Sequence, residues 1–111
     1  MLPNESRIID CILSTVIAAG YCCSVVEGDY LEINRSTDIT SIKEAITGEG
    51  ETYLRVLKQD DPFHLGTVVL IFNNGNEGID IIADTASCDH AAFDALLAPV
   101  YQLVDSLDST E

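Results

Sequence analysis

The first part of this chain follows a helical period. Apolar side chains recur every three or four positions over residues 5–19, which predicts an amphipathic helix there. Either Asn4 or Ser6 is expected to cap its beginning, because both side chains can accept a hydrogen bond from an exposed backbone N–H. Gly20 suits its end, where a left-handed backbone is common.

Two further helices are predicted downstream. Residues 36–38, Ser-Thr-Asp, are typical of a helix start, and the short apolar face after them ends near Gly48. The last helix is expected to begin after Asp89. Its apolar stripe consists of Phe93, Leu96, Leu97, Val100, Tyr101, Val104 and Leu107. Pro99 lies inside the stripe, so this helix is expected to kink or break near residues 97–98.

Five other segments show the alternation or the β-branched apolar runs of strands. They are residues 21–26, 30–35, 52–58, 66–72 and 79–83. Residues 27–29 read as a turn between the first two strands. Residues 73–78 are rich in Asn and Gly, which tolerate positive φ, and predict a hairpin turn before the fifth strand.

The predicted order is α-β-β-α-β-β-β-α, and the fold class is α+β. The whole chain, residues 1–111, is expected to form one domain. Short connections favour an antiparallel sheet of about five strands with the helices packed on one face. The other face would then be open. If it carries apolar side chains, we expect a second copy of the chain to cover it, giving a homodimer.

Charge is distributed unevenly along the sequence. The formal net charge is -14, yet residues 59–111 contain ten carboxylates and no Lys or Arg. Such a surface repels nucleic acid, nucleotides and anionic lipid, and it attracts basic proteins. We therefore expect no direct nucleic-acid binding and no membrane binding. The expected partner is a basic protein.

The best functional hypothesis is a non-enzymatic interaction protein of the inhibitor, immunity or anti-restriction type. Its carboxylates would occupy a basic cleft on a nuclease, restriction enzyme or toxin, and their field would speed association. The candidate partner-binding residues are Asp80, Asp84, Asp94, Asp105 and Asp108. Asp80 and Asp84 are predicted to share one face of the fifth strand, since side chains alternate along a strand.

No catalytic, cofactor or metal site is predicted. Cys88, Asp89 and His90 are too closely spaced for a zinc pair, and the Asn-rich turn lacks the bidentate Glu of a calcium loop. Cys22 and Cys23 have no recognisable base beside them. An acidic field would also oppose thiolate formation, so buried structural thiols are expected.

Two alternatives remain open. The chain could be a small-molecule binder or minor enzyme, with a pocket between sheet and helices lined by aromatic side chains. These are Tyr21, Tyr30, Tyr53 and Tyr101. The acidity could instead serve solubility in a salt-rich cytosol, where proteins are rich in Asp and Glu and poor in Lys.

Two segments resemble a loose set of small, acidic, uncharacterised bacterial and phage-borne proteins. They are residues 35–38, Arg-Ser-Thr-Asp, and residues 74–84, from Asn74 to Asp84 around the last hairpin. That set has no activity to transfer, so the resemblance implies only a mobile-element origin. Residues 1–7 are polar and lack the pattern of a secretory signal, and the apolar runs are short, so a cytoplasmic location is expected.

Overall fold

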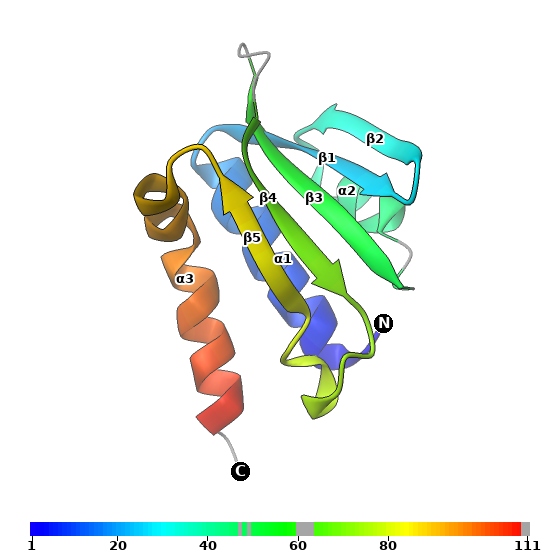
Figure 1. Ribbon diagram of the computed structural model, residues 1–111, viewed down its shortest axis with the longest axis vertical. Helices are drawn as coiled ribbons and strands as arrows, with labels where there is room; N and C mark the ends of the chain where they lie inside the picture. The colour runs from blue at the N-terminus through cyan, green and yellow to red at the C-terminus, as the bar shows by residue number, and fades with distance from the viewer. Residues whose placement is uncertain (47, 49, 60–63, 110–111) are drawn as a thin grey trace.

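The computed structural model describes residues 1–46, 48, 50–59 and 64–109 (Figure 1). In chain order its elements are α1 (Pro3–Ala18), β1 (Tyr21–Glu27), β2 (Tyr30–Ser36), α2 (Ile39–Ala45), β3 (Glu51–Lys58), β4 (His64–Ile71), the 3₁₀ turn η1 (Asn76–Gly78), β5 (Ile82–Ser87) and α3 (His90–Ser109). The predicted α+β class and the order of helices and strands are confirmed.

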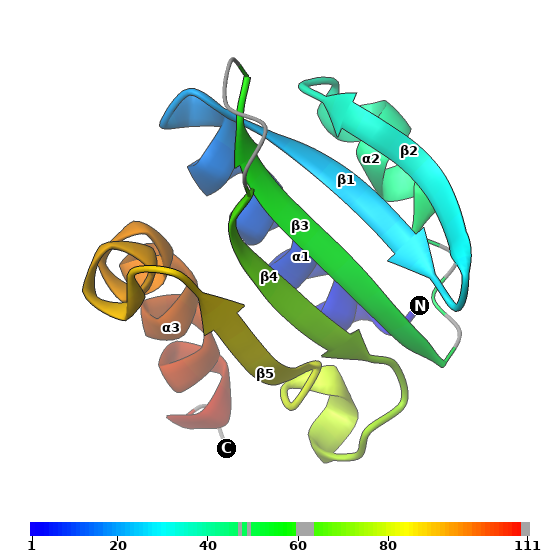
Figure 2. The same ribbon diagram turned by 45° about the horizontal axis from the view of Figure 1, so that its top comes forward.

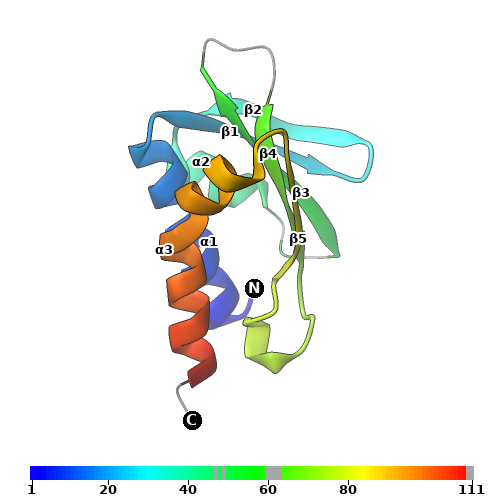
Figure 3. The same cartoon turned by 60° about the vertical axis from the view of Figure 1, so that its left-hand side comes forward.

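The five strands form one antiparallel sheet in the order β2-β1-β3-β4-β5. All three helices lie on one face of it, with α1 and α3 side by side and α2 behind β1 and β2 (Figures 1 and 3). The opposite face carries no helix and is turned toward the viewer in Figure 2. The predicted one-sided arrangement of helices is therefore confirmed.

The core lies between the sheet and the helices. Alternate residues of β1, β3 and β4 point toward the helices, as the period of a strand requires. They meet the buried apolar stripe of α1, and the central members of this cluster are Ile8, Ile12, Leu13, Val16, Val25, Leu54, Val56, Val68 and Leu70. Phe93 of α3 joins them by lying against Gly66, where a Cβ would come within 2.8 Å of the ring.

The helix starts agree with the sequence in two cases and differ in one. Asp38 caps α2 by accepting the backbone N–H of Thr40 at 3.1 Å, and Asp89 caps α3 through Ala92 at 3.1 Å. α1, however, begins at Pro3, with Leu2 as its N-cap and no side-chain cap. Proline is favoured in the first turn because its missing N–H would have no partner there.

Glu5 explains how α1 starts without Asn4 or Ser6 as a cap. One of its carboxylate oxygens accepts the backbone N–H of Leu2 at 2.7 Å, and the other accepts that of Asn73 at 2.8 Å. The side chain is fully buried. Glu5 therefore joins the first turn of α1 to the loop after β4, and Gly78 packs directly against it.

The fifth strand is displaced from its predicted position. Residues 79–83 were expected to form it, whereas β5 covers Ile82–Ser87. Ile79 and Ile81 are buried although they precede the strand, since the loop that carries them packs onto the core. The apolar residues Ile79 and Ile81 therefore mark a buried loop and not a strand. Residues 73–78, predicted as a hairpin turn, do lie between the antiparallel strands β4 and β5, in a connection where Asn73, Gly75, Glu77 and Gly78 adopt positive φ.

α3 is continuous from His90 to Ser109 although Pro99 lies within it. Figure 3 shows the helix changing direction between its first turns and the remainder. A bend of this kind is expected N-terminal to a proline, whose ring displaces the preceding turn and removes one hydrogen bond. The prediction of a kink agrees with this view, and the alternative of a break does not.

Candidate functional site

Basic residues are confined to one part of the molecule, whereas acidic residues occur throughout it. The part of the chain that the structure describes after residue 63 forms β4, η1, β5 and α3, and its sequence contains no Lys or Arg. We call the exposed carboxylates of η1, β5, α3 and the loops that join them the anionic side. They are Glu77, Asp80, Asp84, Asp89, Asp94, Asp105 and Asp108. The five cations of the chain lie on α1, β2, α2 and β3, away from β5.

Asp80 and Asp84 do not share a strand face as predicted. Asp80 lies in the loop before β5, and Asp84 lies within the strand opposite Val69 of β4. The register then shifts, because Leu70 pairs with Ile82 and leaves Ala83 as an extra residue. A bulge of this kind breaks the alternation on which the prediction rested. Both carboxylates are nevertheless exposed.

The remaining candidates, Asp94, Asp105 and Asp108, are exposed on α3. The last turns of α3 and the loop that contains Asp80 lie at the same end of the molecule (Figures 1 and 3). Asp84 and Asp94 extend the acidic surface along the edge strand and the first half of the helix.

Tyr101 connects α3 to β5 within this acidic surface. Its side chain hydrogen-bonds to that of Thr85. Burial raises the pKa of Tyr101, the hydrogen bond to Thr85 opposes this rise, and the nearby charge of Asp94 adds to it.

The end of α3 is electrostatically unfavourable for the helix itself. The C-terminus of a helix carries partial negative charge, and carboxylates there cost about 0.3–1 kcal/mol each at an exposed site. Asp105 and Asp108 lie near this end, and the last turn has no basic residue. Burial of Phe93, Leu97 and Val100 holds the helix in place.

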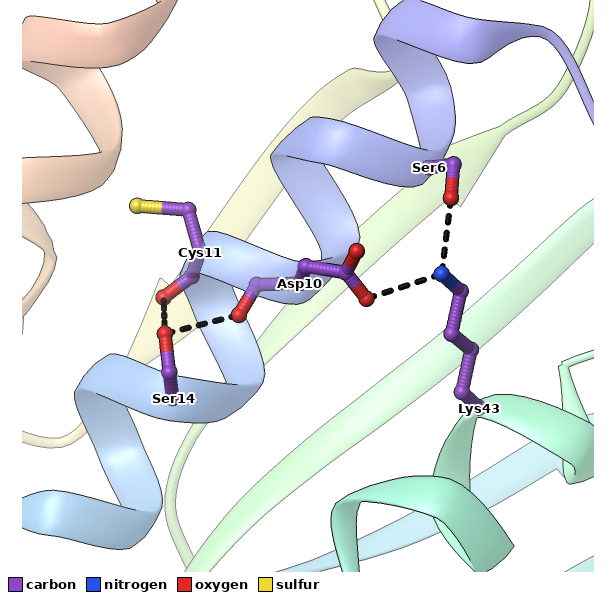
Figure 4. Close-up of polar contacts among 5 residues, drawn as sticks. All are labelled: Ser6, Asp10, Cys11, Ser14 and Lys43. Carbon is purple, nitrogen blue, oxygen red and sulfur yellow. Dashed lines mark hydrogen bonds and ion pairs between the residues drawn. The ribbon is translucent and has the colours of Figure 1, made fainter.

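A second polar cluster lies between α1 and α2 (Figure 4). Lys43 Nζ is 2.8 Å from the carboxylate of Asp10 and donates to Ser6 Oγ at 2.7 Å. These side chains border a groove of about 420 Å³ that also includes Met1, Ile39, Thr40 and Glu44. We call this cluster the Lys43 clasp, because it joins α2 to α1.

The Lys43 clasp does not form a catalytic dyad in this arrangement. A serine nucleophile needs a neighbouring base to take its proton. Lys43 instead donates to Ser6 while facing a carboxylate, so its nitrogen offers no lone pair to the hydroxyl. Ser14 is also engaged, donating to the carbonyl oxygen of Asp10 at 2.8 Å. The geometry is that of an interhelical contact.

Cys22 and Cys23 also lack the surroundings of nucleophiles. Both are buried, and because they are adjacent on β1 they point to opposite faces of the sheet. Burial, together with neighbouring Cys22, raises the pKa of Cys23 to about 12. The Cys22 thiol donates to the carbonyl oxygen of Leu57 at 3.4 Å. Within the described part of the chain, no three His, Cys, Asp or Glu side chains converge as a metal site would require.

The helix-free face of the sheet holds a feature that the sequence analysis did not single out. Arg55 lies on the central strand β3 with Tyr53 on the same face, and the two line a hollow of about 270 Å³ with Val26, Gly28 and Thr67. Among the described residues, Arg55 has no hydrogen bond or ion pair. The available signal was a cation inside an otherwise apolar and aromatic run, residues 53–57.

Comparison with models of known protein families, with curated proteins and with solved structures found no match for this chain. In the described residues, none of the helices has the length and apolar character needed to cross a membrane.

Proposed function

We propose that the protein is a non-enzymatic interaction protein that binds a basic protein partner through its anionic side. The observation that carries this proposal is the one-sided placement of charge. Seven exposed carboxylates lie on η1, β5, α3 and the adjoining loops, segments whose sequence contains no Lys or Arg. The partner class remains the inhibitor, immunity or anti-restriction type, with a toxin or nuclease as target and an origin in a mobile element.

The physical basis of this proposal is electrostatic complementarity between the anionic side and a basic partner. A surface of one sign steers an oppositely charged partner and can raise the association rate by orders of magnitude. Carboxylates held on a helix and an edge strand have fixed spacing, so they can occupy a cleft that otherwise receives phosphates.

The one-sided charge also bears on the solubility alternative. Selection for solubility in a salt-rich cytosol acts on the whole surface and gives no reason to exclude Lys and Arg from β4, β5 and α3 in particular. Five cations are present elsewhere on the molecule. The distribution is therefore better explained by docking.

The small-molecule alternative receives less support. It placed a pocket between sheet and helices, where the structure has its buried core. The four tyrosines also lie apart. Tyr30 is 75% exposed in the β1–β2 hairpin, Tyr53 lies on the helix-free face, and Tyr101 lies on α3.

Calorimetry with a basic protein encoded beside this chain's gene tests the proposal. The variant Asp94→Asn/Asp105→Asn/Asp108→Asn should weaken binding about tenfold or more, because each lost charge pair contributes roughly 0.5 kcal/mol or above. The matched control, Asp29→Asn/Glu32→Gln/Glu44→Gln, changes the net charge equally at exposed sites outside the anionic side. It should bind nearly as the wild type does. Equal weakening by both variants, or an affinity that does not change with salt, would contradict the proposal.

A further inference from the structure

The helix-free face of the sheet carries two parallel rows of cross-strand neighbours. The first row is apolar and ends in a carboxylate, running through Leu31, Val26, Tyr53, Val69 and Asp84. The second row is adjacent and runs through Ser24, Arg55, Thr67 and Ala86. Together they cover β1, β3, β4 and β5, and the first row reaches β2. We call this surface the open face.

The apolar row is incompletely covered. Leu31 is 53% exposed, and Val26, Tyr53 and Val69 are half-buried although each lies on an inner strand. The Tyr53 hydroxyl donates to the carboxylate of Glu51 at the margin of the face. A contiguous apolar surface that spans several strands is typical of a protein–protein contact.

The charges on the open face complement each other. Arg55 is exposed and without a described partner, in a chain with five cations and 19 carboxylates. Asp84 is exposed on the same face. It lies two strands and one row away from Arg55, a separation of roughly 12 Å between Cα atoms at the usual strand spacing. A surface that offers a guanidinium and a carboxylate at separate points can bind a second copy of itself, because each charge then meets the opposite charge.

We propose that two copies of this chain associate through their open faces, with Arg55 of each pairing with Asp84 of the other. A two-fold axis in the interface plane, crossing β4 between Thr67 and Val69, exchanges these two positions. The same axis places Tyr53 of one copy close to Val69 of the other, so the apolar rows meet as the ion pairs form. The occupant of the face is therefore a second copy, and the helices remain outside with the α3 aspartates exposed.

This association should respond to salt in the opposite sense to partner binding. Each chain carries -14, so two copies repel each other at low ionic strength. At physiological salt the Debye length is about 8 Å. Salt therefore reduces the long-range repulsion between the two chains more than it weakens the short-range ion pair between Arg55 and Asp84. Dimerisation should strengthen as salt is added from low ionic strength, whereas binding of a basic partner should weaken.

Sedimentation equilibrium with charge-reversal variants tests the proposal. Wild type should show twice the chain mass of 12.0 kDa. Arg55→Glu and Asp84→Arg should each raise the dissociation constant about tenfold or more, which corresponds to roughly 1.4 kcal/mol. The double variant Arg55→Glu/Asp84→Arg should recover association, because the pair is restored with reversed signs. Arg7→Glu is the matched control, with the same charge change on an exposed residue of α1.

A monomeric wild type at millimolar concentration and physiological salt would overturn the proposal. So would a double variant that stays as weak as either single variant while circular dichroism shows all of them folded. These results leave the proposed function untouched, since its test uses Asp94, Asp105 and Asp108 and keeps Arg55 and Asp84. Likewise, a negative result in the partner-binding test would leave the dimer proposal unaffected, because sedimentation measures the mass of the wild type without a partner.

Discussion

At the scale of single residues, Glu5 and Gly78 determine how the loop before β5 meets α1. A Cβ on Gly78 would come within 2.6 Å of Glu5 Cγ, and Gly78 has a φ of +87°. Gly78→Ala should therefore lower the free energy of unfolding through backbone strain of about 1–2 kcal/mol and overpacking of about 1–3 kcal/mol. Urea denaturation measures the sum.

Gly75 provides the control within the same loop. Its φ of +85° is nearly the same, but no heavy atom lies within 4 Å of a Cβ built there. Gly75→Ala should thus show the strain alone, about 1–2 kcal/mol. If the two variants lose equal stability, Gly78 is not packed against Glu5 as described.

Cys23 should make stability depend on pH in the alkaline range. Its pKa is raised from 9.0 to about 12. Above pH 9 the unfolded chain loses this proton while the folded chain keeps it, so stability is complete below that pH and declines as the pH rises toward 12. The decline attributable to Cys23 is at most about 1.4 kcal/mol per pH unit. It appears as the difference in slope between wild type and Cys23→Ala, and identical slopes would contradict the burial of this thiol.

At the scale of elements, the Lys43 clasp should contribute little energy despite its position between two helices. The side chains of Lys43 and Asp10 are 33% and 55% exposed, so solvent screens their attraction. A double-mutant cycle with Lys43→Met and Asp10→Asn should give a coupling of about 0.2–1 kcal/mol. A coupling several times larger would mean that the groove is closed to water and that the clasp has a further role.

Elements whose signals are local could be predicted from the sequence. The caps Asp38 and Asp89 act on backbone groups two or three residues away, so residue type and position suffice to identify them. The start of α1 could not be predicted, because the Glu5 carboxylate that accepts the Leu2 N–H is also buried against Asn73. The start of β5 could not be predicted, because Ile79 and Ile81 are buried in the loop before it. A buried Glu is indistinguishable in sequence from an exposed one.

The functional surfaces, too, could be predicted from the sequence only in part. The charge asymmetry is written in the sequence, and the structure adds that β5 is an edge strand and lies on the same side as α3. The prediction that Asp80 and Asp84 share one strand face was wrong, because the sequence does not reveal the bulge at Ala83. Arg55 was missed because only strand register shows which side chains share its face.

At the scale of the whole molecule, the protein has two surfaces that differ in charge and in position. The anionic side lies on η1, β5, α3 and their loops, and the open face lies on the sheet away from the helices. Asp84 belongs to both, at the edge where they meet. A molecule arranged in this way can associate with a second copy and still present its α3 aspartates to a basic partner.

The most direct test of the central claim is a nuclear magnetic resonance titration of the folded chain with a short oligolysine at low salt. The account predicts that amide shifts concentrate at Asp80, Asp84, Asp94, Asp105 and Asp108 and that they diminish as salt is added. Shifts of equal size at Asp29, Glu32 and Glu44, which are exposed on the other side, would contradict it.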